Sequence, residues 1–148
     1  MVKNGKWVKL KDTTLTNFNL NNVASGTNLK FAVKAYYKSA ISLEWADKAT
    51  TINTCTKPSK VTGLASKVVT KNAVKTSWKK TNGATGYKVY VAKNGKWDSV
   101  GTTKNNTYTF KGLKKNTKYK FAVKAYKKVG NKTVYADSFA VVNVKTKR

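Results

Sequence analysis

The chain has 148 residues and carries 31 basic against 5 acidic residues, which gives a formal net charge of +26. Its 40% share of hydrophobic residues is too high for a disordered polyelectrolyte, and its single cysteine excludes an internal disulfide. Thr, Val, Lys, Asn and Tyr are abundant whereas Leu, Glu, Gln and Met are scarce, which favours strands and turns and predicts an all-β protein.

The first predicted element is a β-hairpin at the very start of the chain. Asn4 and Gly5 lie between Val2 and Trp7, and an Asn-Gly pair favours a two-residue hairpin turn because both central positions need positive φ. Only Met1 and Val2 precede the turn, so one of the two strands of this hairpin is almost missing.

The chain then repeats itself at a fixed offset. KNGKW occurs at residues 3–7 and 93–97, and KFAVKAY occurs at residues 30–36 and 120–126, so both pairs are 90 positions apart (93 − 3 and 120 − 30). Chance similarity between two Lys-rich stretches does not give a gap-free register over about fifty positions. The chain therefore contains two copies of one domain.

The second repeat, residues 58–148, has the alternating pattern of an antiparallel β-sandwich. Turn signals such as Asn82-Gly83 and Asn94-Gly95 separate its short apolar and polar runs. Short alternating strands at this spacing predict two packed sheets. The predicted strands are residues 61–64, 73–78, 87–91, 97–100, 107–110, 118–125 and 134–144.

The order of the motifs in this repeat resembles the bacterial fibronectin type III domain family. The motifs are PSKVTGL, VKTSW, GATGYKVY, WDSVGTT and GLKKNTKYKFAVKAY, and the resemblance covers the whole of residues 58–148. It implies that Trp78 and Tyr87 are core aromatics, and that Leu113 and Tyr119 form a tyrosine corner whose hydroxyl bonds to the backbone near Leu113. Thr76 departs from the family, because it stands at a position that is usually apolar.

The first repeat, residues 1–57, is incomplete. Residues 58–92 precede KNGKW in the second repeat, whereas only two residues precede it in the first. The counterparts of residues 61–64, 73–78 and 87–91, which are strands A, B and C in the family's naming, are therefore absent. Leu29 also replaces the corner tyrosine. The expected fold is a tandem of immunoglobulin-like antiparallel β-sandwiches, the first incomplete. The expected core residues are Trp78, Tyr87, Leu113, Tyr119, Phe121 and Val123 in the second repeat and Phe31 and Val33 in the first.

The composition leaves little for catalysis or metal binding. The chain has no histidine, one cysteine and five carboxylates, so the usual acid–base, nucleophile and metal-ligand sets are nearly unavailable. Asp47 and Asp137 occupy the same position in the two repeats and do not form a dyad. We expect no enzymatic activity, no cofactor and no metal site.

Aromatic residues are the remaining candidates for ligand contacts. Trp7 and Trp97 follow the two hairpin turns, and Tyr90 and Tyr126 are expected to face outward beside lysines. An exposed ring on a strand can stack on a sugar or a base. The alternative for each is ordinary packing across the neighbouring strand.

The lysines also have two interpretations. A surplus of this size attracts polyanions such as anionic cell-wall polymers, acidic glycans or nucleic acid. Arg148 is the only arginine, which disfavours nucleic acid because bidentate phosphate and base-edge contacts rely on the guanidinium group. Evenly spread lysines equally serve solubility and protect sheet edges.

These observations predict a non-catalytic spacer or adhesion module. The resemblance implies a secreted or cell-surface bacterial protein, extracellular or cell-wall associated, although the chain shows no signal peptide and no membrane-spanning run. The first alternative is a Lys-rich polyanion-binding module. The second is a subunit of a filament or two-chain complex, in which the same or another chain supplies the strands that residues 1–57 lack.

Overall fold

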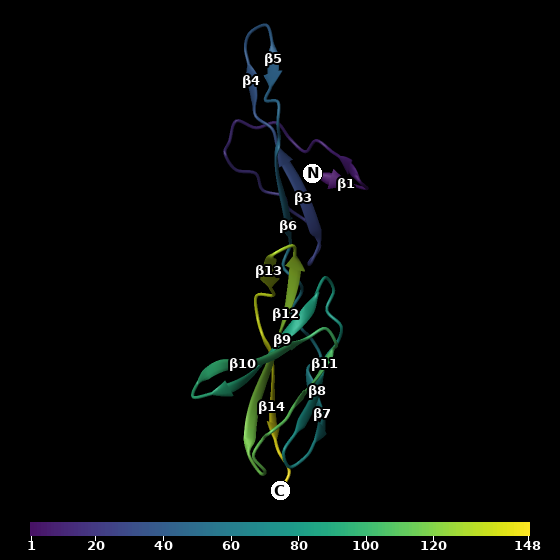
Figure 1. Ribbon diagram of the computed structural model, residues 1–148, viewed down its shortest axis with the longest axis vertical. Coiled ribbons are helices and arrows are strands. Elements are labelled where there is room, and N and C mark those ends of the chain that lie inside the picture. Colours follow the sequence, from purple (N-terminus) through teal and green to yellow (C-terminus); the bar gives the residue numbers. More distant parts are fainter.

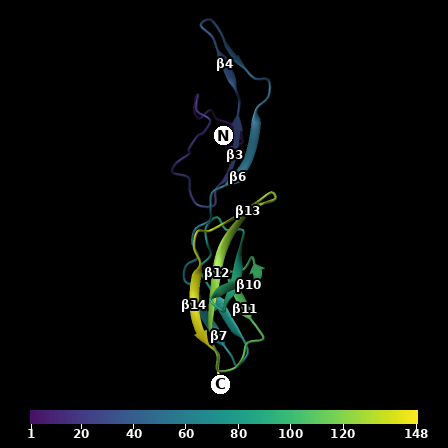
Figure 2. The same ribbon diagram turned by 90° about the vertical axis from the view of Figure 1, so that its left-hand side faces the viewer.

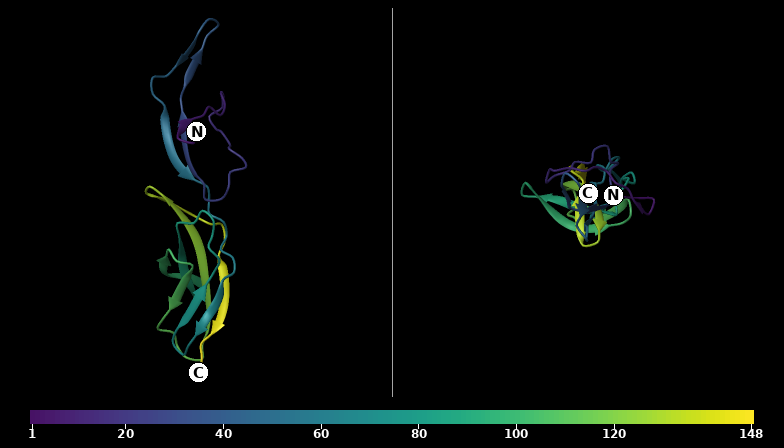
Figure 3. Two further views of the ribbon diagram at one scale, coloured as in Figure 1. Left: turned by 90° about the vertical axis from the view of Figure 1, so that its right-hand side faces the viewer. Right: turned by 90° about the horizontal axis from the view of Figure 1, so that it is seen from above.

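A computed structural model describes residues 1–148, and all of its regular secondary structure is β-strand (Figure 1). The two repeats follow one another along the long axis, with the C-terminus at the far end of the second (Figure 1). Seen from above they overlap in projection (Figure 3, right). The structure contains no helix that is long and apolar enough to cross a membrane.

The second repeat is a sandwich of two antiparallel sheets (Figure 2). The smaller sheet has the order β11-β8-β7, and the larger has the order β10-β9-β12-β13 with β14 also paired to β12. The strands of the smaller sheet are β7 (Ala65–Val69), β8 (Val74–Ser77) and β11 (Thr107–Phe110). The strands of the larger sheet are β9 (Gly86–Lys93), β10 (Lys96–Thr103), β12 (Lys118–Val129), β13 (Lys132–Tyr135) and β14 (Ala140–Lys145).

Two of the predicted strands are wrong in detail. Residues 61–64 are not a strand, and the first strand begins only at Ala65, because Gly63 has a φ of +66° that interrupts an extended backbone. The predicted last strand is broken between Tyr135 and Ala140, where its pairing with β12 changes register. This break matters for the site, because Phe139 lies within it.

The core lies between the two sheets and follows the alternation of the strands. Phe121 on β12 stacks on Phe110 on β11 with ring centroids 3.9 Å apart. Trp78 meets Tyr87 edge to face at 5.2 Å. The polar Thr76 is tolerated in this core because its hydroxyl donates a hydrogen bond to a backbone carbonyl. The buried cluster is Val61, Val74, Trp78, Tyr87, Val89, Val91, Phe110, Phe121, Val123, Ala125, Ala136 and Ala140.

The tyrosine corner implied by the resemblance has its hydrogen bond in the structure. The backbone N–H of Lys114 donates to the hydroxyl of Tyr119 at 2.8 Å. Leu113 packs against the core and donates its own N–H to the carbonyl of Asn72 at 2.9 Å. The first bond ties the turn before β12 to β12 itself, and the second ties it to the β7–β8 loop of the smaller sheet.

The first repeat consists of three separate two-stranded pairs. The turn at Asn4 and Gly5 has φ values of +49° and +76°, which is the positive-φ geometry that the hairpin requires. No strand corresponds to β11 of the second repeat. The pairs are β1 (Val2–Lys3) with β2 (Lys6–Trp7), β3 (Asn28–Val33) with β6 (Thr50–Cys55), and β4 (Tyr36–Lys38) with β5 (Leu43–Trp45).

The assignment of Val33 to a core is wrong. Its side chain is 72% exposed, and Phe31 on the same strand is only half-buried. Both residues need a facing sheet to cover them, and the strands that build that sheet in the second repeat have no counterpart here. All of the buried apolar side chains belong to the second repeat.

The two repeats touch at a junction made by loops. Gly26 of the first repeat lies against Gly83 of the second, so closely that a Cβ atom on Gly26 would be 2.2 Å from the Cα of Gly83. Both glycines have positive φ, at +67° and +73°. Beside them, the ammonium group of Lys57 forms an ion pair with Asp137.

Candidate functional site

The outer face of the larger sheet gathers the exposed aromatic and basic side chains of the second repeat. Successive residues of a strand point to opposite faces, so Tyr87, Val89 and Val91 of β9 enter the core while Lys88 and Tyr90 point outward. On β12 the same alternation leaves Lys120 and Lys124 outward.

Strand register aligns four residues in a line across the outer face of the larger sheet. Trp97 on β10 pairs with Ala92 on β9, and Lys120 on β12 pairs with Asn143 on β14. Because the preceding residue of β9, Val91, pairs with Phe121, Ala92 lies beside Lys120. Because these four residues belong to the second repeat, we call Trp97, Ala92, Lys120 and Asn143 the second row.

Phe139 is the centre of the aromatic cluster on this face. Its ring stacks on Trp97 with centroids 5.7 Å apart and planes 25° apart, and it meets Tyr90 edge to face at 5.1 Å. Ala122, which pairs with Tyr90, is fully buried although its side chain points to this outer face. The cluster therefore covers the middle of the sheet.

Phe139 was missed by the sequence analysis, which placed it inside a continuous last strand. The structure breaks that strand, and the free segment brings the ring back over the sheet. Trp97 thus packs on a residue from a loop rather than on its neighbouring strand. The only signal in the sequence was an aromatic residue where the second half of the strand begins.

Three lysines lie over the rings of this cluster. The Nζ atoms are 5.8 Å from the Tyr90 centroid for Lys88, 5.8 Å from Trp97 for Lys120, and 4.7 Å from Phe139 for Lys124. Each such contact contributes about 0.5–1 kcal/mol at an exposed position. None of these lysines is in an ion pair. The three ion pairs of the chain are Lys9–Asp12, Lys57–Asp137 and Lys93–Asp98.

Burial also changes the acidity of this cluster. Loss of water around the Tyr90 hydroxyl raises its pKa above the ordinary tyrosine value, and the nearby Tyr135 adds a smaller effect in the same direction. Tyr90 therefore stays protonated and neutral over a wider range of pH than an exposed tyrosine.

The other two candidate aromatics lie outside this cluster. Tyr126 lies at the opposite end of β12, where it packs near Tyr135 at 6.1 Å and its hydroxyl lies against Gly86. Trp7 belongs to the first repeat and is 51% exposed. The ammonium group of Lys30 makes a cation–π contact with Trp7, at 5.6 Å from the centre of the ring.

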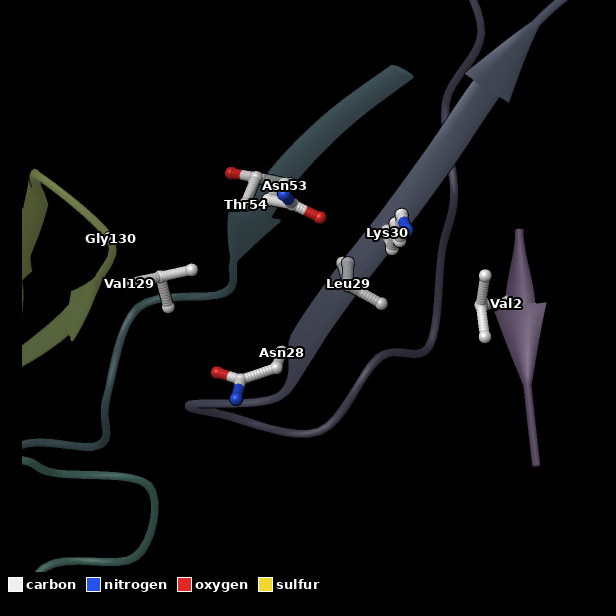
Figure 4. A pocket seen from close by; sticks show the side chains of 8 residues that line it. All are labelled: Val2, Asn28, Leu29, Lys30, Asn53, Thr54, Val129 and Gly130. Carbon is white, nitrogen blue, oxygen red and sulfur yellow. The ribbon is translucent and has the colours of Figure 1, made fainter. Parts of the chain in front are cut away.

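Each repeat has a groove next to its tryptophan. The groove of the second repeat has a volume of about 430 Å³ and is lined by Ala92, Lys118, Tyr119, Lys120, Asn143, Val144 and Lys145. The groove of the first repeat has a volume of about 350 Å³ and is shown in Figure 4. It is lined by Val2, Asn28, Leu29, Lys30, Asn53 and Thr54, with Val129 and Gly130 of the β12–β13 hairpin closing one side.

The structure brings together no set of side chains suited to metal binding. No three His, Cys, Asp or Glu residues lie close enough to hold an ion. Of the two equivalent carboxylates, Asp137 pairs with Lys57 and Asp47 is exposed. The groups that a ligand could contact at the outer face are therefore the lysine ammonium groups, the aromatic rings and the amide of Asn143.

Comparisons with known proteins agree with this architecture. The family model of the fibronectin type III domain matches residues 58–140. Chitinase A1 of Niallia circulans is 33% identical over 139 residues, which cover 86% of this chain and 19% of that protein. The match thus extends into the first repeat, and the chain spans about a fifth of the length of this relative.

Solved structures give the same fold. The structure of FN3tt is similar with a TM-score of 0.54 and 23% identity, and covers 63% of this chain and 98% of its own. Domains d3–d4 of the rat CD45 extracellular region are similar with a TM-score of 0.55 and 16% identity, over 95% of this chain and 75% of theirs. The all-β sandwich and the family match lead to one assignment: the chain belongs to the fibronectin type III domain family.

Proposed function

We propose that this chain is a non-catalytic spacer module of a secreted or cell-surface bacterial protein, extracellular or associated with the cell wall. The observation that carries the proposal is the end-to-end arrangement of the two repeats (Figure 3). An end-to-end tandem of this kind would set the distance between whatever precedes and follows it. An adhesion role would use the same geometry.

The bacterial relative supports this proposal. The chain corresponds to only 19% of the length of Chitinase A1, so a protein of that kind has room for a separate catalytic domain beside such repeats. A spacer in that setting would hold a polymer-degrading domain at a fixed distance from another part of the protein.

The junction provides the experiment. A Cβ atom on Gly83 would lie 2.4 Å from the Cα of Gly26 and 2.7 Å from the carbonyl oxygen of Ser25, so Gly83→Ala forces the repeats apart. We expect small-angle X-ray scattering to give an extended, rigid particle for the natural chain and a broader distribution of shapes for the variant.

Gly112→Ala is the matched control for this substitution. Gly112 also has positive φ, at +69°, but a Cβ atom there meets nothing within 4 Å and it lies away from the junction. Its scattering profile should equal that of the natural chain. If the natural chain already scatters as two independently moving repeats, the spacer proposal is wrong.

A second candidate function concerns the incomplete first repeat. In the second repeat β12 pairs with β9 along Phe121 to Tyr126, whereas the equivalent edge of β3 has no partner. We propose that a segment similar in sequence to residues 58–92 supplies the strands that complete the first repeat.

Placing a copy of residues 58–90 before Met1 tests this candidate. Val33 and Phe31 should become buried, and hydrogen exchange at their amides should slow to the rates measured at Val123 and Phe121. A control copy carries Val74→Lys and Val89→Lys, since both side chains are fully buried in the core of the second repeat. The strand-supply proposal fails if the amides of β3 exchange equally fast with and without the added segment.

A further inference from the structure

The grooves of the two repeats are equivalent. The six residues that the first repeat contributes to its groove correspond, 90 positions later, to six of the seven residues that line the groove of the second. The seventh, Lys145, corresponds to Cys55, which lies at the end of β6. The same hollow therefore forms twice in the molecule.

The residues beside the groove are repeated as well. Trp7 pairs with Val2, and Lys30 pairs with Asn53, in the register seen for the second row. We call Trp7, Val2, Lys30 and Asn53 the first row. The distance from the lysine Nζ to the tryptophan centroid is 5.6 Å in the first row and 5.8 Å in the second.

The first row persists where the sandwich around it does not. The first repeat has no apolar core, its corner tyrosine is replaced by Leu29, and its counterpart of Phe139 is Ala49. The tryptophan, lysine and asparagine of the row are nevertheless identical in both repeats. The trio therefore keeps its arrangement in the first repeat without an apolar core beneath it.

We propose that each row, with the groove beside it, is a binding site for an acidic glycan. The lysine of the row supplies a positive charge that no carboxylate of this chain neutralises. The asparagine amide can donate to a sugar hydroxyl or accept from it. The edge of the tryptophan ring offers an apolar contact to the sugar, beside the polar contacts of the lysine and the asparagine.

Two features favour an acidic glycan over nucleic acid. The only arginine is the C-terminal Arg148, so neither row contains the planar fork that recognises phosphates or base edges bidentately. Trp97 is also already stacked on Phe139 and covered by Lys120, which leaves little ring surface for a base to stack upon. A carboxylated sugar needs only the ammonium group, the amide and the ring edge.

The four tryptophans allow a site-specific test. The probe is trigalacturonate, followed by NMR of the indole N–H signals of the full chain. Trp7 and Trp97 lie in the rows, while Trp45 packs on Tyr36 and Trp78 is buried in the core, so the latter two are internal controls. We expect the signals of Trp7 and Trp97 to shift with added ligand and those of Trp45 and Trp78 to stay.

Charge-neutralising variants assign each site. Lys120→Gln should weaken binding at Trp97 about tenfold and leave Trp7 unaffected, because it removes the ammonium group that makes the charge-assisted bond to the sugar carboxylate. Lys30→Gln should do the reverse. The matched control removes one charge elsewhere, at the exposed Lys75 of the smaller sheet, and should leave both signals responsive.

Each other outcome overturns the proposal. Equal weakening by Lys75→Gln would reduce the effect to diffuse charge. Equal shifts with an uncharged trisaccharide would remove the role of the lysine. A response to oligothymidylate that is as strong, and that is lost in the same row variants, would assign the rows to nucleic acid. No shift of Trp7 or Trp97 at physiological salt would leave no site.

Discussion

KFAVKAY occurs letter for letter in both repeats, yet its side chains have opposite environments. Phe121 and Val123 are fully buried in the second repeat, whereas Phe31 is half-buried and Val33 is largely exposed in the first. The strands β12 and β3 both form, and both pair with the last strand of their repeat, β14 and β6. The difference teaches that the motif specifies the strand, and that the opposite sheet specifies the burial.

Short hydrogen-bonded loops survive in both repeats. The hydroxyl of Thr146 accepts from the N–H of Thr117 at 2.9 Å and donates to the carbonyl of Lys114 at 2.7 Å. Thr56 makes the equivalent pair of bonds with Thr27 and Ala24, at 2.9 and 2.6 Å. In each repeat these bonds connect the loop before one strand to the end of the strand paired with it. They therefore form without the facing sheet that the first repeat lacks.

Removing the phenylalanine of the shared motif KFAVKAY should give the largest difference in stability between the two repeats. Phe121→Ala should lower the free energy of unfolding by about 3–5 kcal/mol, because it empties a fully buried site, whereas Phe31→Ala should change it by less than about 1 kcal/mol. Urea unfolding monitored by the fluorescence of Trp78 measures both. Equal losses would mean that residues 1–57 share a core in solution.

The repeated threonine gives a smaller contrast. Thr146→Ala should lower the free energy of unfolding by about 1–3 kcal/mol, because it removes a buried hydroxyl that bonds the part-buried N–H of Thr117 and carbonyl of Lys114. Thr56→Ala should leave the unfolding of the second repeat unchanged and only speed hydrogen exchange at the Thr27 amide. A loss of global stability in Thr56→Ala would show that the loop supports the junction.

The smallest effect concerns Tyr90, whose strand position has no counterpart in the first repeat. Because the pKa of Tyr90 is raised in the folded state, its contribution to stability is present below the ordinary tyrosine pKa and is lost as pH rises through the raised value. The free energy of unfolding should therefore fall less steeply between about pH 9 and pH 11 in Tyr90→Phe than in the natural chain. Tyr37→Phe, at an exposed tyrosine, is the control and should keep the natural slope.

On the outer face of the larger sheet, part of the candidate site could be predicted from the sequence and part could not. Alternation predicted that Tyr90 and the lysines of β9 and β12 face outward, and the offset of 90 related Trp7 to Trp97. The role of Phe139 was not predictable, because its position depends on a break in the last strand. Alternation within a strand says nothing about where a strand stops pairing and a side chain folds back.

The sequence alone therefore determined the all-β class, the duplication and the hairpin turns. These features depend on local propensity, turn chemistry and register, which neighbouring residues set. The tertiary structure alone decided which apolar residues are buried, which ring covers the outer sheet, and that Gly26 meets Gly83 at the junction. Burial and stacking require partners from distant segments, and identical stretches of sequence differ wherever those partners differ.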